Sequence, residues 1–460
     1  MNKIIICTSN NLLDEKKYVF NHIFSSILGL NWELNLIKTD RYFEITDPGF
    51  KKKIRIKNIF FEKISKKYLS KINLPKIPLK IFDSYQISKT IKLTNRYIPI
   101  IFGKNNFEVK NEVINLDVDI FGTIFFMITR YEEIVCHERD SHNRFSAYDS
   151  LSYKCNFLDR PIVDEYIELL WTLINKNYND IIRKHKKYSF SVSCDVDSPY
   201  EDYVNSFKLF LRRVSSDLIK GNFLELKRKI LNFYNTKFNN FSFDSFDNFD
   251  WLMKINEKFN SSVKFYFLVK NYKNKYDSYY HIKEKRIKNL INNIVNRNHM
   301  ICLHPSYSSY NDNSILEKEI KIFRDIKVKN KLNETRQHYL RWSHKTSEIQ
   351  NKNNIDFDST LGYADVSGFR CGTSHSFKMF DLVNKKQMNL VQIPLLVMEG
   401  TLFSNQYMNL NFDDAWKYVN KLYSYVKLYN GNFTFLWHNS DLVSKKKKSF
   451  YSKCVNKFYE

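Results

Sequence analysis

The chain has 460 residues, too many for one ordinary hydrophobic core, so we expect two domains or one large barrel with an additional module. Hydrophobic residues make up 43% of the chain, which predicts a globular protein. The formal net charge of +24 alone would suggest a polyanionic partner such as nucleic acid or anionic lipid. Because the basic residues are scattered and only residues 445–448 form a cluster, we expect no specific nucleic-acid partner.

The seven cysteines are far apart, odd in number and include no C-x-x-C pair, so they predict neither a disulfide framework nor a structural zinc site. The apolar run at residues 4–7 is too short for the core of a signal peptide. No segment approaches the roughly 18 apolar residues that a membrane-spanning helix needs. We therefore expect a soluble, cytoplasmic protein without a transmembrane segment.

The first part of the chain predicts a smaller accessory α/β domain over residues 1–183. It opens with a short strand at residues 4–7 and a helical stretch. Residues 119–134 have the apolar spacing of a buried helix, and residues 160–174 predict an amphipathic helix that begins beside a proline. A polar loop is expected between these helices. The basic, apolar-poor residues 175–187 then indicate a domain boundary.

The second predicted domain covers residues 184–460, where short strands alternate with amphipathic, lysine-rich stretches. The expected strands are residues 189–194, 263–269, 300–304, 392–398 and 433–437. Strands that alternate with helices favour a parallel α/β sheet or barrel.

Ionisable residues fall at the ends of three of these strands: Asp195 and Asp197, His304, and His438. In α/β barrels the strand-to-helix loops gather at the carboxyl ends of the strands, so these side chains are expected around one cavity. Residues i and i+2 of an extended segment point to the same side, and two adjacent carboxylates repel unless a cation lies between them or one is protonated. The alternatives are two helix-capping aspartates and a histidine that is part of the core.

Four motifs resemble those of the polysaccharide deacetylases of carbohydrate esterase family 4, in the branch with an additional N-terminal domain. "SCDVDS" is similar to the motif whose first Asp is the general base and whose second is a metal ligand, which implies those roles for Asp195 and Asp197. "LHPSYSS" resembles the metal-binding motif and implies His304 as a ligand. "RQHYLRW" and "LWHNS" imply that Arg336 orients the base and that His438 is the general acid.

The sequence departs from this pattern at one expected metal ligand. Ser308 stands where the family has its second histidine, and His338 stands where the Arg-x-Pro-Tyr motif has proline. Zinc sites of the catalytic type use three protein ligands and an open position, so we hypothesise that His338 supplies the missing nitrogen ligand. The expected cofactor is a divalent metal ion, and the types of ligand favour zinc.

The resemblance implies a distorted (β/α) barrel of the polysaccharide deacetylase type, preceded by the accessory domain. It also implies a hydrolase that removes an N-acetyl group from a sugar or glycan in surface-polysaccharide or glycan biosynthesis. The backbone of Tyr339 is expected to help stabilise the oxyanion. The segment at residues 357–377 resembles the family's substrate-lining segment, in which Asp358, Arg370 and His375 are the polar candidates.

Three other readings of the sequence stay open. The first is a catalytically inactive barrel that binds glycan or a partner enzyme, because Ser308 replaces a ligand. The second is hydrolysis of a different C–N bond, as in the family's metal-independent amidase relatives. The third is nucleic-acid binding, which would account for the charge but not for the residues at the strand ends.

Overall fold

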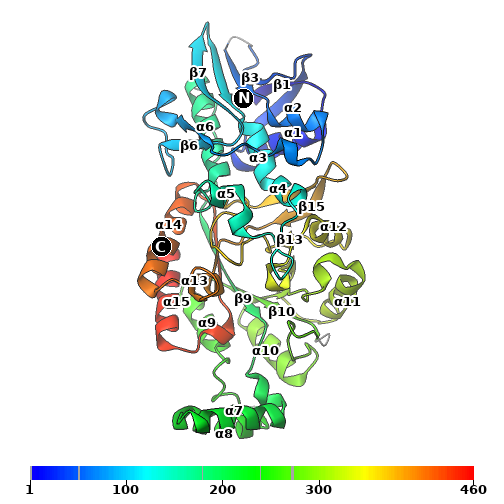
Figure 1. The fold of residues 1–460 in the computed structure, drawn as a ribbon, viewed down its shortest axis with the longest axis vertical. Helices are drawn as coiled ribbons and strands as arrows, with labels where there is room; N and C mark the ends of the chain where they lie inside the picture. The colour runs from blue at the N-terminus through cyan, green and yellow to red at the C-terminus, as the bar shows by residue number, and fades with distance from the viewer. Residues whose placement is uncertain (1–2, 50–51, 179, 239, 271–273) are drawn as a thin grey trace.

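The computed structural model describes residues 3–49, 52–178, 180–238, 240–270 and 274–460, and its fold is mixed α/β. Figure 1 shows the N-terminal sheet and its helices at one end of an elongated molecule, the second sheet in the middle and a helical hairpin at the other end. The α/β class expected from the sequence is confirmed.

The first sheet has six strands in the order β2-β1-β3-β4-β8-β7 and combines parallel with antiparallel pairs. Its strands are β1 (Lys3–Thr8), β2 (Asn31–Leu36), β3 (Tyr42–Thr46), β4 (Lys53–Lys57), β7 (Gly103–Lys110) and β8 (Val113–Val118). In β4, whose sequence is KIRIK, apolar and basic residues alternate, so Ile54 and Ile56 are buried and the basic side chains are only partly covered. This alternation directs one face of the strand into the core.

The single buried helix expected before residue 135 is in fact two helices. The first, α3 (Ile120–Ile128), is buried along its whole length. Arg130 then adopts a left-handed backbone conformation with φ 54°, and α4 (Tyr131–Val135) begins after it. The Arg130 guanidinium forms ion pairs of 2.8 Å with the carboxylates of Glu132 and Glu133, which stabilise this buried turn.

The other helices of this region surround the same core. They are α1 (Leu13–Phe20) with its π-helical continuation η1 (Asn21–Ile27), α2 (Phe60–Lys66), α5 (Leu151–Lys154) and α6 (Ile162–Asn177). Pro161 stands at the N-cap of α6, because proline's fixed φ and missing N–H suit a helix start. The amphipathic helix expected here is confirmed.

The second sheet has nine strands in the order β14-β15-β13-β12-β11-β10-β9-β17-β16. Its strands are β9 (Ser189–Val196), β10 (Val263–Phe267), β11 (Met300–Leu303), β12 (Lys331–Thr335), β13 (Phe357–Asp358), β14 (Phe377–Asp381), β15 (Lys386–Gln392), β16 (Val397–Met398) and β17 (Asn432–Leu436). All neighbouring strands are parallel except the β14–β15 hairpin. The parallel sheet expected from the sequence is thus confirmed.

Four of the five strands expected in this sheet are confirmed, and the fifth differs. Residues 392–398 do not form one strand, since β15 ends at Gln392 and β16 begins at Val397. Pro394 lies between them and cannot donate a backbone hydrogen bond to a neighbouring strand. β12, KLNET, was not expected because it lacks a run of apolar residues.

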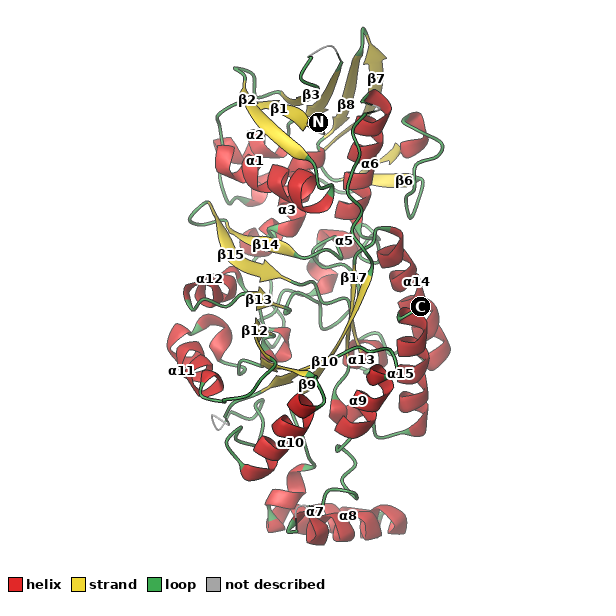
Figure 2. Cartoon of the chain, turned by 180° about the vertical axis from the view of Figure 1, so that it is seen from behind, coloured by secondary structure: helices red, strands yellow, loops and turns green. Residues whose placement is uncertain are grey.

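The nine-stranded sheet is not a closed barrel, and the distorted barrel expected from the sequence is not confirmed. Within the described residues its two edge strands, β14 and β16, do not pair with each other. The strands curve around a central region (Figure 2), and helix α1 covers the β14 edge. There the Tyr18 hydroxyl donates a hydrogen bond of 2.7 Å to the Lys378 carbonyl, and the Tyr18 ring lies 4.9 Å from that of Phe380.

The N-terminal region packs directly on the second sheet. One hydrophobic cluster includes buried residues of both, and an ion pair of 2.6 Å joins the buried side chains of Arg370 and Glu133. All strands of the first sheet precede residue 119 and all strands of the second follow residue 188. The division into residues 1–183 and 184–460 stays a prediction, because the shared core runs across it.

The described residues of the second part of the chain form nine α-helices. They are α7 (Phe207–Ile219), α8 (Phe223–Thr236), α9 (Phe249–Glu257), α10 (Lys285–Asn296), α11 (Asn313–Arg324), α12 (His344–Lys352), α13 (Glu399–Phe403), α14 (Phe412–Leu428) and α15 (Lys445–Phe458). None of the helices formed by the described residues has both the length and the apolar character needed to cross a bilayer.

Candidate metal and acid–base site

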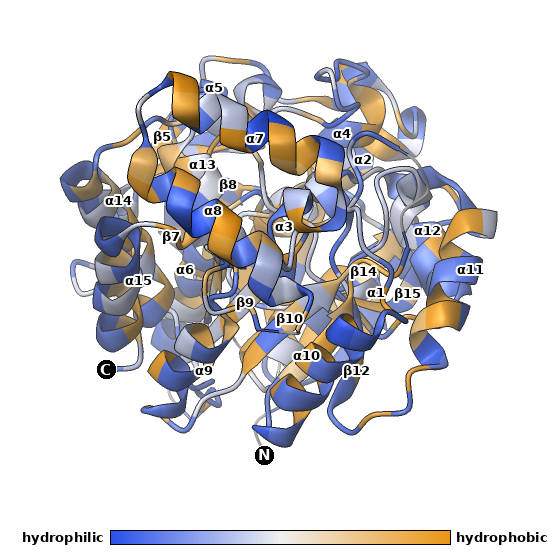
Figure 3. Ribbon diagram, turned by 90° about the horizontal axis from the view of Figure 1, so that it is seen from below, coloured by the Kyte–Doolittle hydropathy of each residue, from blue (hydrophilic) through white to orange (hydrophobic). Residues whose placement is uncertain are grey.

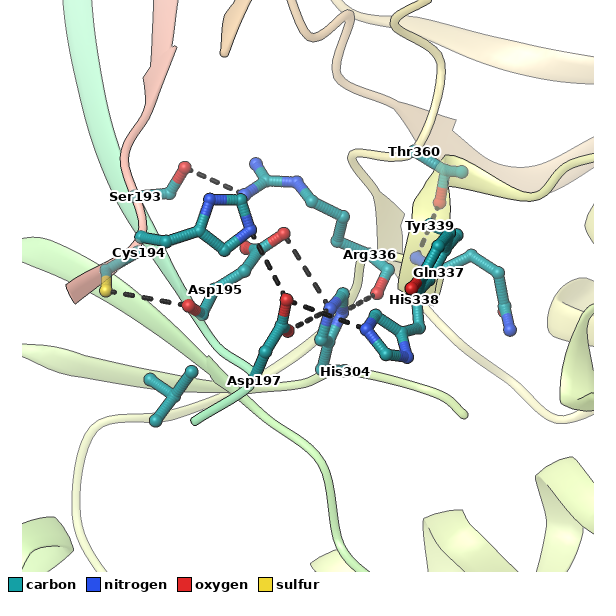
Figure 4. Close-up of polar contacts among 12 residues, drawn as sticks. Ser193, Cys194, Asp195, Asp197, His304, Arg336, Gln337, His338, Tyr339 and Thr360 are labelled. Atoms are coloured by element: carbon teal, nitrogen blue, oxygen red, sulfur yellow. Dashed lines mark hydrogen bonds and ion pairs between the residues drawn. The ribbon is translucent and has the colours of Figure 1, made fainter. Parts of the chain in front are cut away.

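The carboxyl ends of four parallel strands bring the predicted ionisable residues together. Asp195 and Asp197 stand at the end of β9, His304 follows β11, and His438 follows β17. Arg336 and His338 follow β12. Figure 4 shows the side chains of Asp195, Asp197, His304, Arg336 and His338 pointing toward one another, because the parallel strands all end at the same edge of the sheet.

Asp195 and Arg336 form a buried ion pair. Nη1 of Arg336 lies 2.8 Å from Oδ1 of Asp195 and also donates to the Ser193 hydroxyl at 2.8 Å. The other side of the guanidinium donates to the carbonyl and hydroxyl of Ser359, both at 3.0 Å, and the Tyr266 ring lies 4.2 Å away. These contacts fix the guanidinium, so the carboxylate of Asp195 is held in one orientation.

Asp197, His304 and His338 could hold a metal ion, since one ligand atom of each lies within 4.8 Å of the others. Nε2 of His304 lies 3.2 Å from Oδ1 of Asp197, and Nε2 of His338 lies 3.6 Å from Oδ2. Tetrahedral zinc with bonds of about 2.0 to 2.2 Å separates its ligand atoms by about 3.3 to 3.6 Å. The two observed spacings are near this range, so the group is compatible with a divalent cation.

The second nitrogen of each imidazole supports the same conclusion. Nδ1 of His304 hydrogen bonds to the Arg336 carbonyl, and Nδ1 of His338 lies 3.0 Å from Oδ1 of Asp277. An Nδ1–H that donates to these oxygens leaves the Nε2 lone pair free toward Asp197, as a metal ligand requires. Oδ1 of Asp197 is buried and accepts no hydrogen bond from the described residues, so a cation would satisfy it.

The charges in this group also influence one another without a cation. Burial would raise the pKa of Asp197, but His338, His304 and His438 hold it well below its usual range. Burial would lower the pKa of His338, but the carboxylates of Asp197 and Asp277 raise it to about 9. A protonated His338 between two carboxylates is therefore the metal-free alternative to a coordinated His338.

His438 also contacts Asp197, with Nε2 3.5 Å from Oδ2 of that carboxylate. Its Nδ1 forms an ion pair with Glu399, and its backbone N–H donates to the same carboxylate at 3.1 Å. Burial would lower the pKa of His438, but Glu399 and then the two aspartates raise it to about 10. Glu399 was not expected, although it directly follows strand β16 and the strand-end rule would have indicated it.

The site opens into a cavity of about 150 Å³. Its lining residues are Arg144, Asp195, Asp197, His304, His338, Tyr339, Leu340, Ala364, Met398, Tyr407 and His438. Tyr339 has a left-handed backbone with φ 60°, and its carbonyl accepts a hydrogen bond of 3.0 Å from Nη1 of Arg144. Arg144, which the sequence did not indicate, therefore brings the N-terminal region into the wall of this cavity.

Three predicted substrate-binding residues lie elsewhere and have other partners. Asp358 is fully buried and accepts a hydrogen bond of 2.9 Å from the Gln350 amide. Arg370 is held in its ion pair with Glu133. His375 is 5% exposed, and burial, followed by the charge of Lys186, lowers its pKa to about 3. None of the three lines the cavity beside Asp197, so the structure does not bring them to this site.

The fold and site define an α/β protein with a carboxylate, arginine and histidine cluster at the ends of parallel strands. Residues 4–179 match the model of a family of unknown function, DUF7033. No curated protein has a sequence that matches the chain significantly.

Two solved structures are similar in part. One, from Mycobacterium smegmatis, is assigned as a polysaccharide deacetylase; it is 12% identical with a TM-score of 0.38, and the match covers 59% of this chain and 85% of that one. The other, from Bordetella bronchiseptica, is assigned as a polysaccharide deacetylase involved in O-antigen biosynthesis. It is 12% identical with a TM-score of 0.25, and the match covers 41% of this chain and 64% of that one.

Proposed function

We propose that the chain is a metal-dependent hydrolase that removes an N-acetyl group from a sugar in surface-polysaccharide or glycan biosynthesis. The observation that carries this proposal is the Asp195–Arg336 ion pair beside the group of Asp197, His304 and His338. The four motifs that resemble the polysaccharide deacetylases contribute these same residues. In this proposal the open, curved sheet is a distorted form of that family's barrel, and residues 1–183 are its accessory domain.

Asp197, His304 and His338 would hold the divalent ion, and two nitrogens with one carboxylate oxygen favour zinc. Such an ion supplies Lewis acidity, which polarises an amide carbonyl and makes water easier to deprotonate. Residues of the chain supply the general base, the general acid and the group that stabilises the oxyanion.

Asp195 accepts the proton of the attacking water, and Arg336 holds its carboxylate in one orientation. His438 donates a proton to the departing amine from Nε2, while Glu399 holds its Nδ1. The backbone N–H of Tyr339, at the cavity wall, stabilises the oxyanion of the tetrahedral intermediate. Each polar step of amide hydrolysis thus has a residue of suitable chemistry within one cavity.

The test combines acetate release from N-acetylated sugars with elemental analysis of the purified protein. We expect one divalent ion per chain and activity that a chelator removes and zinc restores. His338→Ala should abolish both metal retention and turnover, and Ser308→Ala should leave metal content unchanged as the matched control. A His338→Ala variant that keeps its metal would overturn the assigned ligand.

A second candidate is an inactive protein of this type that binds glycan or a partner enzyme. It is favoured by the chain of contacts from Asp277 through His338 to Asp197, which balances charge without an ion. Metal-free protein that binds N-acetylated glycan without releasing acetate would support it. Acetate or ammonia release that a chelator does not affect would instead favour a metal-independent amidase.

A further inference from the structure

A helical hairpin formed by α7 and α8 extends from the body of the molecule (Figure 1). It is inserted after β9, so only nine residues separate Asp197 of the candidate site from Phe207, the first residue of α7. The hairpin therefore leaves the molecule from the strand edge that carries the site.

The inner face of the hairpin is closed by its own contacts. The rings of Phe210 and Phe233 stack at 4.2 Å, and Arg228 forms an ion pair of 2.6 Å with Glu201 near the base. The turn between the helices is well defined, since Gly221 has φ 69° and its N–H donates a hydrogen bond of 3.1 Å to the Leu218 carbonyl. These contacts bury only a small part of the apolar surface of the two helices.

The outer surface of the hairpin is unusually apolar for a protein exposed to water. Nine large apolar side chains are exposed there, namely Phe207, Leu211, Leu218, Ile219, Phe223, Leu224, Ile230, Tyr234 and Phe238. The exposure is greatest at the tip, where Ile219 is 86% exposed and Leu224 is 88% exposed. Large apolar surfaces of this kind mark sites of interaction with proteins or membranes.

Basic residues surround these apolar side chains. Residues 207–238 contain eight Lys and Arg but only two acidic residues. Within the described part of the chain, Lys208, Arg212, Lys220 and Lys227 are exposed and form no ion pair with a carboxylate. Figure 3 views the molecule from the hairpin's end and shows apolar and hydrophilic residues alternating along both helices.

We propose that this hairpin binds the surface of an anionic lipid bilayer. Apolar side chains at the tip would enter the boundary between headgroups and acyl chains, and the unpaired lysines and arginines would contact lipid phosphates. Charge complementarity favours a bilayer over a second copy of this basic chain. The apolar tip favours a bilayer over nucleic acid, whose backbone would leave Ile219 and Leu224 in water. This inference is independent of the proposed hydrolase activity.

The test is cosedimentation of the full chain with vesicles of phosphatidylcholine that contain about one third phosphatidylglycerol, at low and high salt. We expect binding that falls as salt rises and that is much weaker with pure phosphatidylcholine. The combined variant Ile219→Ser, Phe223→Ser and Leu224→Ser should bind about tenfold or more weakly. Its circular dichroism and thermal midpoint should match those of the unmodified chain, because these side chains are exposed.

The matched control replaces three exposed apolar residues outside the hairpin: Leu36→Ser, Ile72→Ser and Val443→Ser. It should bind vesicles like the unmodified chain, and so should Asp195→Asn, which separates membrane binding from catalysis. Equal binding by the tip variant, or no binding by the unmodified chain, would overturn the proposal. Self-association that the tip variant abolishes, without vesicle binding, would also overturn it and assign the tip to a second copy of the chain.

Discussion

Oδ1 of Asp277 lies 3.0 Å from Nδ1 of His338, on the side of the imidazole that faces away from Asp197. This contact sets the tautomer of His338. Asp277→Ala would remove this acceptor, so the tautomer whose Nε2 is free to bind a metal would no longer be favoured. We expect metal affinity to fall about 10- to 100-fold, measured by competition with a chromophoric chelator. Unchanged affinity would show that Asp277 does not set the metal-binding tautomer of His338.

Asp195→Asn should lower kcat by about 10²- to 10⁴-fold, because the amide cannot accept a proton from water. Metal content should stay the same, since Asp195 is outside the group of three ligands. Acetate release and elemental analysis on the same preparation check both statements. Near-normal turnover would show that Asp195 is not the general base.

Glu399→Gln should lower kcat because a neutral amide no longer holds Nδ1 of His438 as the carboxylate does. The loss should be smaller than that of His438→Ala, for which we expect about 10²- to 10⁴-fold. Both variants should retain the metal. Equal rates for Glu399→Gln and the unmodified chain would show that Glu399 does not position the acid.

Arg370→Ala should destabilise the fold and leave substrate binding by the folded protein unchanged. It would leave the buried carboxylate of Glu133 with one partner fewer, a loss that typically costs about 3 to 5 kcal/mol. Urea unfolding measures the loss, and KM measured below the unfolding transition should not change. An increased KM without loss of stability would show that Arg370 contributes to substrate binding.

The buried carboxyl of Glu319 should make the free energy of unfolding depend on pH. Burial raises the pKa of this carboxyl from an ordinary value of 4.5 to about 8. The contribution of this group to the free energy of unfolding is fully present below pH 4.5 and is lost as pH rises to about 8. The reason is that the unfolded chain releases the proton at a lower pH than the folded chain does. Glu319→Gln should therefore gain stability relative to the unmodified chain by up to about 1.4 kcal/mol per pH unit across this window. Urea unfolding at several pH values checks this, and a constant difference would contradict it.

Local patterns in the sequence were sufficient to predict which residues lie together at the centre of the candidate site. Asp195, Asp197, His304 and His438 each follow an apolar segment that forms a strand, and parallel strands direct their carboxyl ends to one edge. The i, i+2 spacing of the two aspartates is a property of any extended backbone. For these reasons the α/β class and the set of convergent residues could be inferred before any contact was known.

Only the tertiary structure decided which other residues join them. The contacts of Asp277 and Arg144 with this site depend on how loops pack, and loops carry no periodic signal that a sequence can reveal. The structure also places Asp358 and Arg370 outside the cavity, because Asp358 accepts hydrogen bonds from Gln350 and Thr335 and Arg370 pairs with Glu133. Long-range packing also sets the β14 edge of the second sheet, since helix α1 of the N-terminal region covers this edge through Tyr18. Long-range packing thus determined the boundary of the site, whereas strand order and residue type determined its centre.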